Sequence, residues 1–200
     1  MSATGPVKVV MSRDRNQLRK EAYLLRKKFG LEKEKYFPIM EFLELVMPKI
    51  DPSFSVVPVE DSELIGRAAE TIPEQHLIRV KESVYDGACL GAFWARSVMA
   101  HELGHYLCHS DGNVIYAYPA LGERIPRDID PEWQANVFAA ELLAPVHLID
   151  EENEYLVSKH FGVPKHTAKT QMVQVRKIQR RHDKRKLSTK RKTVERQLNR

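Results

Sequence analysis

Apolar residues recur along this chain at spacings typical of helices. Over residues 13–30 they return every three or four positions, and Gly30 supplies a stop, which predicts an amphipathic helix. The same pattern predicts helices over 38–47, where Pro48 closes the run, and over 93–109. A fourth helix is expected over 131–143, with Asp130 as its N-cap and proline at its first position. The chain is therefore expected to be mainly helical.

Extended segments are fewer and shorter. Strands are expected over 54–59, 76–80 and 114–118, with residues 71–73 as a loop between the first two. Pro58 lies inside the first strand and cannot donate a ladder hydrogen bond, so that strand is expected at a sheet edge.

The segment 156–172 has the pattern of a helix-turn-helix. Its apolar residues bracket a turn at Gly162, and a second helix is expected to start near Pro164. Such a unit either contacts DNA or serves as a small packing module on the preceding domain.

Composition limits the class of protein. With 200 residues and 42% hydrophobic residues, the chain suits one globular domain with an appendage. No apolar run approaches the roughly 20 residues that span a bilayer, and the first ten residues lack the features of a secretory signal. Cys89 and Cys108 form no disulfide framework, so a reducing cytoplasm is the expected location.

The net charge of +5 is unevenly distributed. Residues 176–200 hold twelve Lys or Arg and two acidic residues, a net charge of +10, which leaves the rest of the chain at −5. This segment is expected to be a flexible basic tail. Any nucleic-acid contact would then be non-specific, salt-sensitive and confined to the tail.

The motif with chemical content is His101-Glu102-Leu103-Gly104-His105. On a helix, residues four apart share a face, so both imidazoles can reach one metal ion, and Glu102 lies beside them to hold a water. Zinc suits two imidazole ligands and lowers the pKa of a bound water. By chance the motif arises in roughly 3% of shuffled chains, but its place in an apolar helix strengthens it, because buried polar groups need partners.

A catalytic zinc needs a third protein ligand. His109 lies about 12 Å along the helix from His101, too far to share the ion, and is expected to support the site without ligating. Glu132 and Glu141 on the next helix lie on opposite faces, so only one can face the metal. Asn136 shares the face of Glu132 and is expected to hydrogen-bond a ligating imidazole, which favours Glu132.

Two motifs together resemble a known family. Met99-Ala-His-Glu-Leu-Gly-His105 followed by Glu132-Trp-Gln-Ala-Asn-Val-Phe-Ala-Ala-Glu-Leu-Leu-Ala-Pro145 is similar to the ImmA/IrrE metallo-endopeptidases, as is the lead-in of Tyr85 and Gly87. The resemblance covers residues 85–145. Ala144 and Cys108 depart from residues that the family often has there, Met and Leu.

The resemblance implies a zinc ion on His101, His105 and Glu132, with Glu102 as general base. It also implies an α+β, gluzincin-like fold in which helices pack around a small antiparallel sheet. The expected layout is a peptidase domain over 1–150, a helix-turn-helix segment over 151–175 and the tail over 176–200.

In that reaction Glu102 takes a proton from the attacking water and returns it to the leaving amine. A further donor should stabilise the anionic transition state, and Tyr106, Tyr116, Tyr118 and His109 all remain candidates. An edge strand beside the cleft offers a place for an extended substrate.

The resemblance implies a partner transcriptional repressor as substrate, in the regulation of a phage, a mobile element or a stress response. A competing interpretation is a non-proteolytic, toxin-like partner of an Xre-type antitoxin, and a third is a DNA-associated regulator. The intact Glu102 favours the enzyme, because metal binding alone does not need it.

Overall fold

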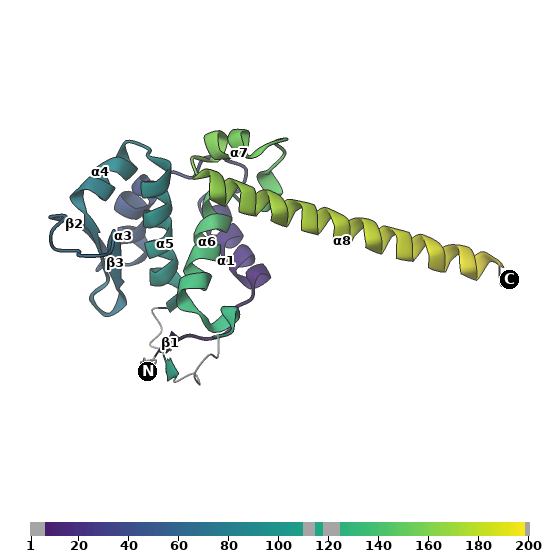
Figure 1. Cartoon of the computed structure of the whole chain (residues 1–200), viewed down its shortest axis with the longest axis horizontal. Helices are drawn as coiled ribbons and strands as arrows, with labels where there is room; N and C mark the ends of the chain where they lie inside the picture. The colour runs from purple at the N-terminus through teal and green to yellow at the C-terminus, as the bar shows by residue number, and fades with distance from the viewer. Residues whose placement is uncertain (1–6, 110–114, 118–124, 199–200) are drawn as a thin grey trace, which may run out of the picture.

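The computed structural model describes residues 7–109, 115–117 and 125–198. Helix α5 (Phe93–His109) runs through the middle of the molecule, between a small sheet on one side and helix α6 (Pro131–Leu143) on the other (Figure 1). Helix α1 (Arg15–Lys28) packs on α6. These helices match the expected ones closely, and the fold is α+β as expected.

The crossing of α5 and α6 is tight at Gly104. A Cβ atom at this position would lie 3.1 Å from the carbonyl oxygen of Ala135 and 3.2 Å from its Cα. Only a glycine lets the two backbones approach this closely without a shift. Gly104 lies between the two motif histidines, so this contact brings the start of α6 toward them.

The three-stranded sheet is mixed, whereas an antiparallel sheet was expected. Its strands are β2 (Ser55–Val59), β3 (Ala69–Ile72) and β4 (Leu77–Lys81), in the order β2-β4-β3. A short 3-10 turn, Pro73–Gln75, joins β3 and β4, so these two are antiparallel. Strand β4 lies between β3 and β2 and runs parallel to β2.

Two expectations about this sheet have different outcomes. Strand β2, which contains Pro58, is an edge strand as predicted. Residues 71–73 were expected to be a loop, but Thr71 and Ile72 belong to β3. The strand is short and half polar, so pairing with β4, and not its own pattern, makes it extended.

The helix expected over 38–47 continues past its proline. It consists of α2 (Ile39–Glu41), a π-helical turn (Phe42–Val46) and α3 (Met47–Ile50). The π-turn resets the hydrogen-bond register, so Pro48 lies in the first turn of α3, where its missing N–H is tolerated.

One helix, one strand and two short 3-10 turns were not expected from the sequence. Helix α4 (Glu82–Cys89) precedes α5, and strand β1 (Val7–Val9) pairs antiparallel with β5 (Ile115–Ala117). Strand β5 lies within the expected strand 114–118, whose two end residues fall outside the described residues. Short 3-10 turns flank α6 at Arg127–Ile129 and Val146–Leu148.

The helix-turn-helix pattern corresponds to α7 (Glu154–Phe161) and α8 (Lys165–Leu198). Gly162 joins them with a φ of +64°, a conformation that favours glycine. The turn is anchored by Arg96, which is buried, stacks on the ring of Tyr36 at 3.7 Å and donates to the carbonyls of Phe37 and Gly162. The unit is thus packed firmly on the body.

The boundary expected between residues 175 and 176 falls inside α8. The helix runs on to Leu198 and extends away from the body (Figure 1). Lys, Arg and Gln are good helix formers, and no glycine or proline follows Pro164, so the basic segment is helical. No helix in the described ranges has both the length and the hydropathy to cross a membrane.

Candidate metal centre

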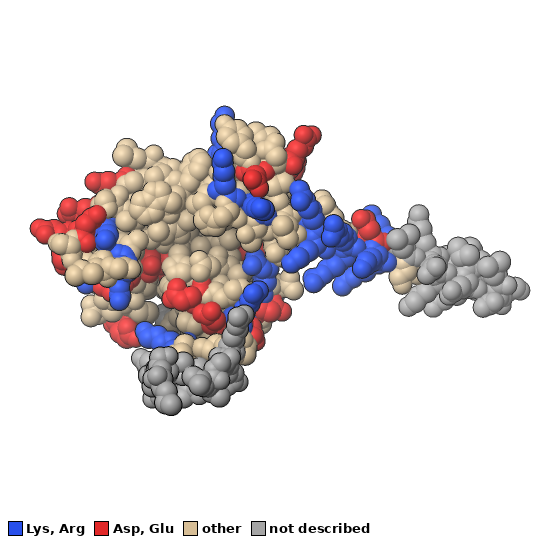
Figure 2. Space-filling view, viewed as in Figure 1, with Lys and Arg blue, Asp and Glu red and all other residues tan. Residues whose placement is uncertain are grey.

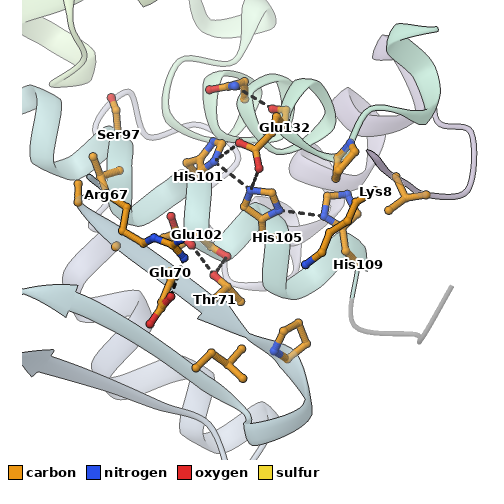
Figure 3. A pocket seen from close by; sticks show the side chains of 18 of the residues that line it. Lys8, Arg67, Glu70, Thr71, Ser97, His101, Glu102, His105, His109 and Glu132 are labelled. Carbon is orange, nitrogen blue, oxygen red and sulfur yellow. Dashed lines mark hydrogen bonds and ion pairs between the residues drawn. The ribbon is translucent and has the colours of Figure 1, made fainter. Parts of the chain in front are cut away.

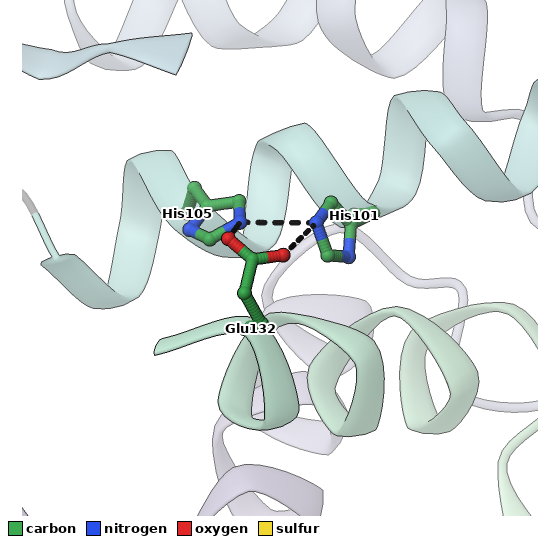
Figure 4. Close-up of side chains that lie close together, drawn as sticks. All are labelled: His101, His105 and Glu132. Carbon is green, nitrogen blue, oxygen red and sulfur yellow. Dashed lines mark hydrogen bonds and ion pairs between the residues drawn. The ribbon is translucent and has the colours of Figure 1, made fainter. Parts of the chain in front are cut away.

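Three side chains from two helices converge on one point. The Nε2 atoms of His101 and His105 are 3.0 Å apart, and each lies 3.3 Å from a different carboxylate oxygen of Glu132 (Figure 4). Each residue offers a ligand atom, and these atoms all lie within 4.8 Å of one another. Among the described residues, this is the group of His, Cys, Asp or Glu that could hold a metal ion.

Local sequence explains this convergence. His101 and His105 lie one turn apart on the same face of α5. Glu132 is the second residue of α6, whose start is fixed by Asp130, because the Asp130 side chain accepts from the backbone N–H of Glu132 and Trp133. The contact at Gly104 then brings this first turn of α6 up to the histidines.

Contacts within the cluster shift the pKa values of Glu132 and His101. Hydrogen bonds with His101 and His105 hold the pKa of the Glu132 carboxyl well below its usual range. Burial lowers the pKa of His101, but the hydrogen bond to Glu132 and the charges of Glu102 and Glu132 outweigh it and raise that pKa overall. The site therefore attracts positive charge.

A relay of side chains extends from the far side of His105. Its Nδ1 lies 3.1 Å from Nδ1 of His109, and Nε2 of His109 lies 3.2 Å from the side-chain oxygen of Gln134. The Gln134 amide donates to the carbonyls of Met11 and Asp128, which fixes its orientation. Burial and the charge of His105 lower the pKa of His109 to about 4. His109 thus touches a donor residue without joining the donor set.

Asn136 lies one turn after Glu132 on α6. Its side chain donates to the backbone carbonyl of Glu132 at 2.8 Å and lines the same pocket as the donor cluster. Asn136 therefore shares the pocket side of α6 with Glu132, and the hydrogen bond to a ligating imidazole stays a prediction.

Glu102 is buried on the sheet side of the cluster. The hydroxyl of Thr71, on β3, donates to Oε2 of Glu102 at 2.6 Å (Figure 3). Sequence reasoning missed Thr71, because it took this segment for a loop, and no local pattern indicates that β3 lies beside α5. Glu70 on the same strand pairs with Arg67 and Arg79, both at 2.8 Å.

A pocket of about 980 Å³ opens in front of these groups. Strand β3 and its flanks form one wall, and Lys8, Trp94, Val98 and His166 contribute elsewhere (Figure 3). His101, Glu102, His105 and Glu132 all line it. The donor cluster is therefore accessible to a large molecule.

Other candidate residues lie away from the cluster. Glu141, the rival third ligand, is buried on the opposite face of α6 and pairs with Arg15 and Arg19 of α1. Tyr106, a candidate oxyanion donor, donates instead to Asp51 and does not line the pocket. The side chain of Tyr116 and the whole of Tyr118 lie outside the described residues.

Comparisons with known proteins bear on this cluster. A family model, the IrrE N-terminal-like domain (Peptidase M78), matches residues 87–175. No curated protein matches the chain in sequence. One solved structure, described as a Mycobacterium tuberculosis transcriptional regulator, is similar at 18% identity and a TM-score of 0.49. The match covers 76% of this chain, which spans 44% of that protein.

The family match extends the region of resemblance in one direction. It contains both motifs and continues through α7 into the first third of α8, beyond the segment 85–145 that the sequence motifs indicated. The family is one of peptidases that use a metal ion, and the donor cluster offers a site for one. This match over residues 87–175 supports the resemblance to the ImmA/IrrE family of metallopeptidases.

Proposed function

We propose that this protein is a zinc-dependent endopeptidase. The observation that carries the proposal is the convergence of His101, His105 and Glu132 at the wall of an open pocket, with Glu102 beside them. The match of residues 87–175 to a peptidase family model supports the same class of reaction.

The spacing of the donor atoms suits zinc. Bonds of about 2.0–2.1 Å in a tetrahedral site place ligand atoms about 3.3–3.4 Å apart. Here the two imidazole nitrogens are 3.0 Å apart, and each lies 3.3 Å from a different oxygen of the Glu132 carboxylate. Two imidazoles and one carboxylate also form a familiar catalytic zinc set, which leaves a fourth position for water or substrate.

The relay behind His105 favours the same assignment. An imidazole that ligates through Nε2 must carry its proton on Nδ1. In His105 that proton would be donated to Nδ1 of His109, and His109 would donate from Nε2 to Gln134. The low pKa of His109 keeps this ring neutral, as the relay requires.

Glu102 is the proposed general base. When bound, zinc would acidify a water in the open position and polarise the carbonyl of the scissile peptide bond. Glu102 accepts the proton from the attacking water and passes it to the leaving amine, so that the C–N bond breaks with no net change of charge. Thr71 holds Oε2 of Glu102, which leaves Oε1 for the water.

The geometry also suggests how a substrate binds. Strand β3 is an edge strand, and residues 68–74 line the pocket. An extended peptide added to this edge would run past Glu102 and the donor cluster. The proposed substrate is a transcriptional repressor that acts with this protein in the cytoplasm, which rests on the family resemblance.

The competing proposal is a toxin-like partner that binds an Xre-type antitoxin without cutting it. One assay separates the two: the zinc-loaded protein is mixed with any small helix-turn-helix protein that a neighbouring gene encodes. Fragments that disappear when the metal is chelated support the endopeptidase, whereas a stable complex without fragments supports the toxin-like partner.

We expect His105→Ala to lose its metal. The variant removes one of three protein ligands, so bound zinc should fall from about one per chain to nearly none after dialysis. Elemental analysis of the purified protein measures this. His166→Ala is the matched control, because His166 lines the same pocket outside the donor set. A zinc-replete His105→Ala protein would contradict the ligand assignment.

We expect Thr71→Val to slow turnover while zinc stays bound. A hydrogen bond to a charged group contributes about 1.5–3 kcal/mol, so kcat should fall roughly 10- to 100-fold with little change in KM. Thr71→Ser restores the hydroxyl and should recover most of kcat. Equal rates for the valine and serine variants would show that the hydroxyl does not orient Glu102.

A further inference from the structure

The exposed part of α8 carries a concentrated positive charge. Five Lys and Arg residues, which we call the basic face, lie on one side of the helix and are all exposed: Arg176, Lys177, Arg180, Arg181 and Lys184. At about 100° per residue they occupy an arc of about 140°. Lys186 and His182 point away from this arc, and Asp183 lies at its edge.

The basic face stands clear of the body. The last described buried residue of α8 is Met172, and every side chain from Gln179 to Lys186 is exposed. In Figure 2 the Lys and Arg side chains gather along the helix where it leaves the body. Because the chain outside 176–200 has a net charge of −5, attraction for anions is concentrated on this helix.

From this placement, we propose that the basic face of α8 binds the phosphate backbone of duplex DNA without reading its sequence. Arg176, Arg180 and Lys184 form a row with a rise of about 6 Å between neighbours, and Lys177 and Arg181 form a second row beside it. A protruding helix of this kind can lie along or in the major groove, which is about 12 Å wide.

The residues present argue against other anionic partners. Residues 176–186 include a single apolar side chain, Ile178, so this part of the helix has no apolar face that could enter a membrane interface. The same segment lacks aromatic residues, on which single-stranded bases would stack. It also lacks the aromatic anchors that dominate the affinity of protein–protein contacts. Phosphates need only positive charge.

This proposal does not depend on the metal centre. The donor cluster is on α5 and α6, and no residue of the basic face lines its pocket. If both proposals hold, non-specific DNA binding would hold the peptidase near repressors that are bound to DNA. Each proposal can fail without the other.

The experiment measures binding of the full chain to a labelled random-sequence duplex of about 30 base pairs, between about 50 and 200 mM salt. The test variant changes all five basic-face residues to Gln, which preserves helix propensity. The matched control changes five exposed lysines of the body to Gln, with the same loss of net charge: Lys20, Lys27, Lys33, Lys49 and Lys159.

We expect the slope of log K, the DNA-binding constant, against log salt concentration to become shallower by about 4.5 in the basic-face variant, because each of the five lost phosphate contacts accounts for about 0.9. The control variant should keep the wild-type slope. Equal losses in both variants would overturn the proposal, since net charge alone would explain binding. The proposal would also be overturned if the wild-type protein does not bind the duplex but binds another polyanion. Binding to polyglutamate would then indicate an acidic protein as partner, and binding to anionic vesicles would indicate a lipid surface.

Discussion

Glu102→Gln should abolish cleavage and leave the metal in place. The amide keeps the shape of the side chain and its contact with Thr71, but it cannot accept a proton from water. General-base catalysis contributes about 100- to 10,000-fold, so the rate should fall by at least that factor. Zinc content should stay near wild type, because Glu102 is not in the donor set.

The measurement is fragment formation from a candidate helix-turn-helix repressor, with zinc content determined on the same preparations. Glu74→Gln is the matched control, since Glu74 is another glutamate that lines the pocket and lies outside the donor cluster. It should cleave at close to the wild-type rate. Full activity in Glu102→Gln would remove Glu102 from the reaction.

The helices that carry the centre could be predicted from sequence because their signals are local. Asp130 and the proline after it mark the start of α6, and the structure has the helix over the expected residues. The four-residue spacing of His101 and His105 likewise follows from helix geometry alone. Local rules therefore place both donor histidines on one face of α5.

The choice of the third donor depended on how two helices cross. Sequence spacing shows that Glu132 and Glu141 lie on opposite faces of α6, and Asn136 and the family resemblance both favoured Glu132. The reason that Glu132 faces the histidines lies in helix packing. Gly104 lies against Ala135, and this contact places the first turn of α6 next to α5. Such contacts join residues distant in sequence, and no periodicity shows them.

Two features escaped prediction for related reasons. Strand β3 owes its extended form to pairing with β4, so neither the strand nor the contact of Thr71 with Glu102 has a local signal. The basic segment was interpreted by its charge as a flexible tail, although its Lys, Arg and Gln residues are also good helix formers. Charge predicts a partner, whereas propensity and the absence of breakers predict the helix.

Glu141→Ala should strongly destabilise the fold. The Glu141 carboxylate is fully buried and accepts from Nε and Nη2 of Arg19 at 3.0 and 2.9 Å, with Arg15 at 3.4 Å. Removing it leaves two half-buried guanidinium groups without their partner between α1 and α6. Loss of one member of a buried pair costs about 3–5 kcal/mol.

Urea unfolding followed by circular dichroism gives the free energy of unfolding, and Glu152→Ala, at an exposed position, is the control. The double variant Arg19→Met with Glu141→Leu should recover much of the loss, because an apolar pair of similar volume leaves one charge fewer without a partner. Folded Glu141→Ala protein should also still bind zinc, since Glu141 faces α1. Loss of zinc at full stability would instead make Glu141 the metal ligand and exclude the structural role argued here.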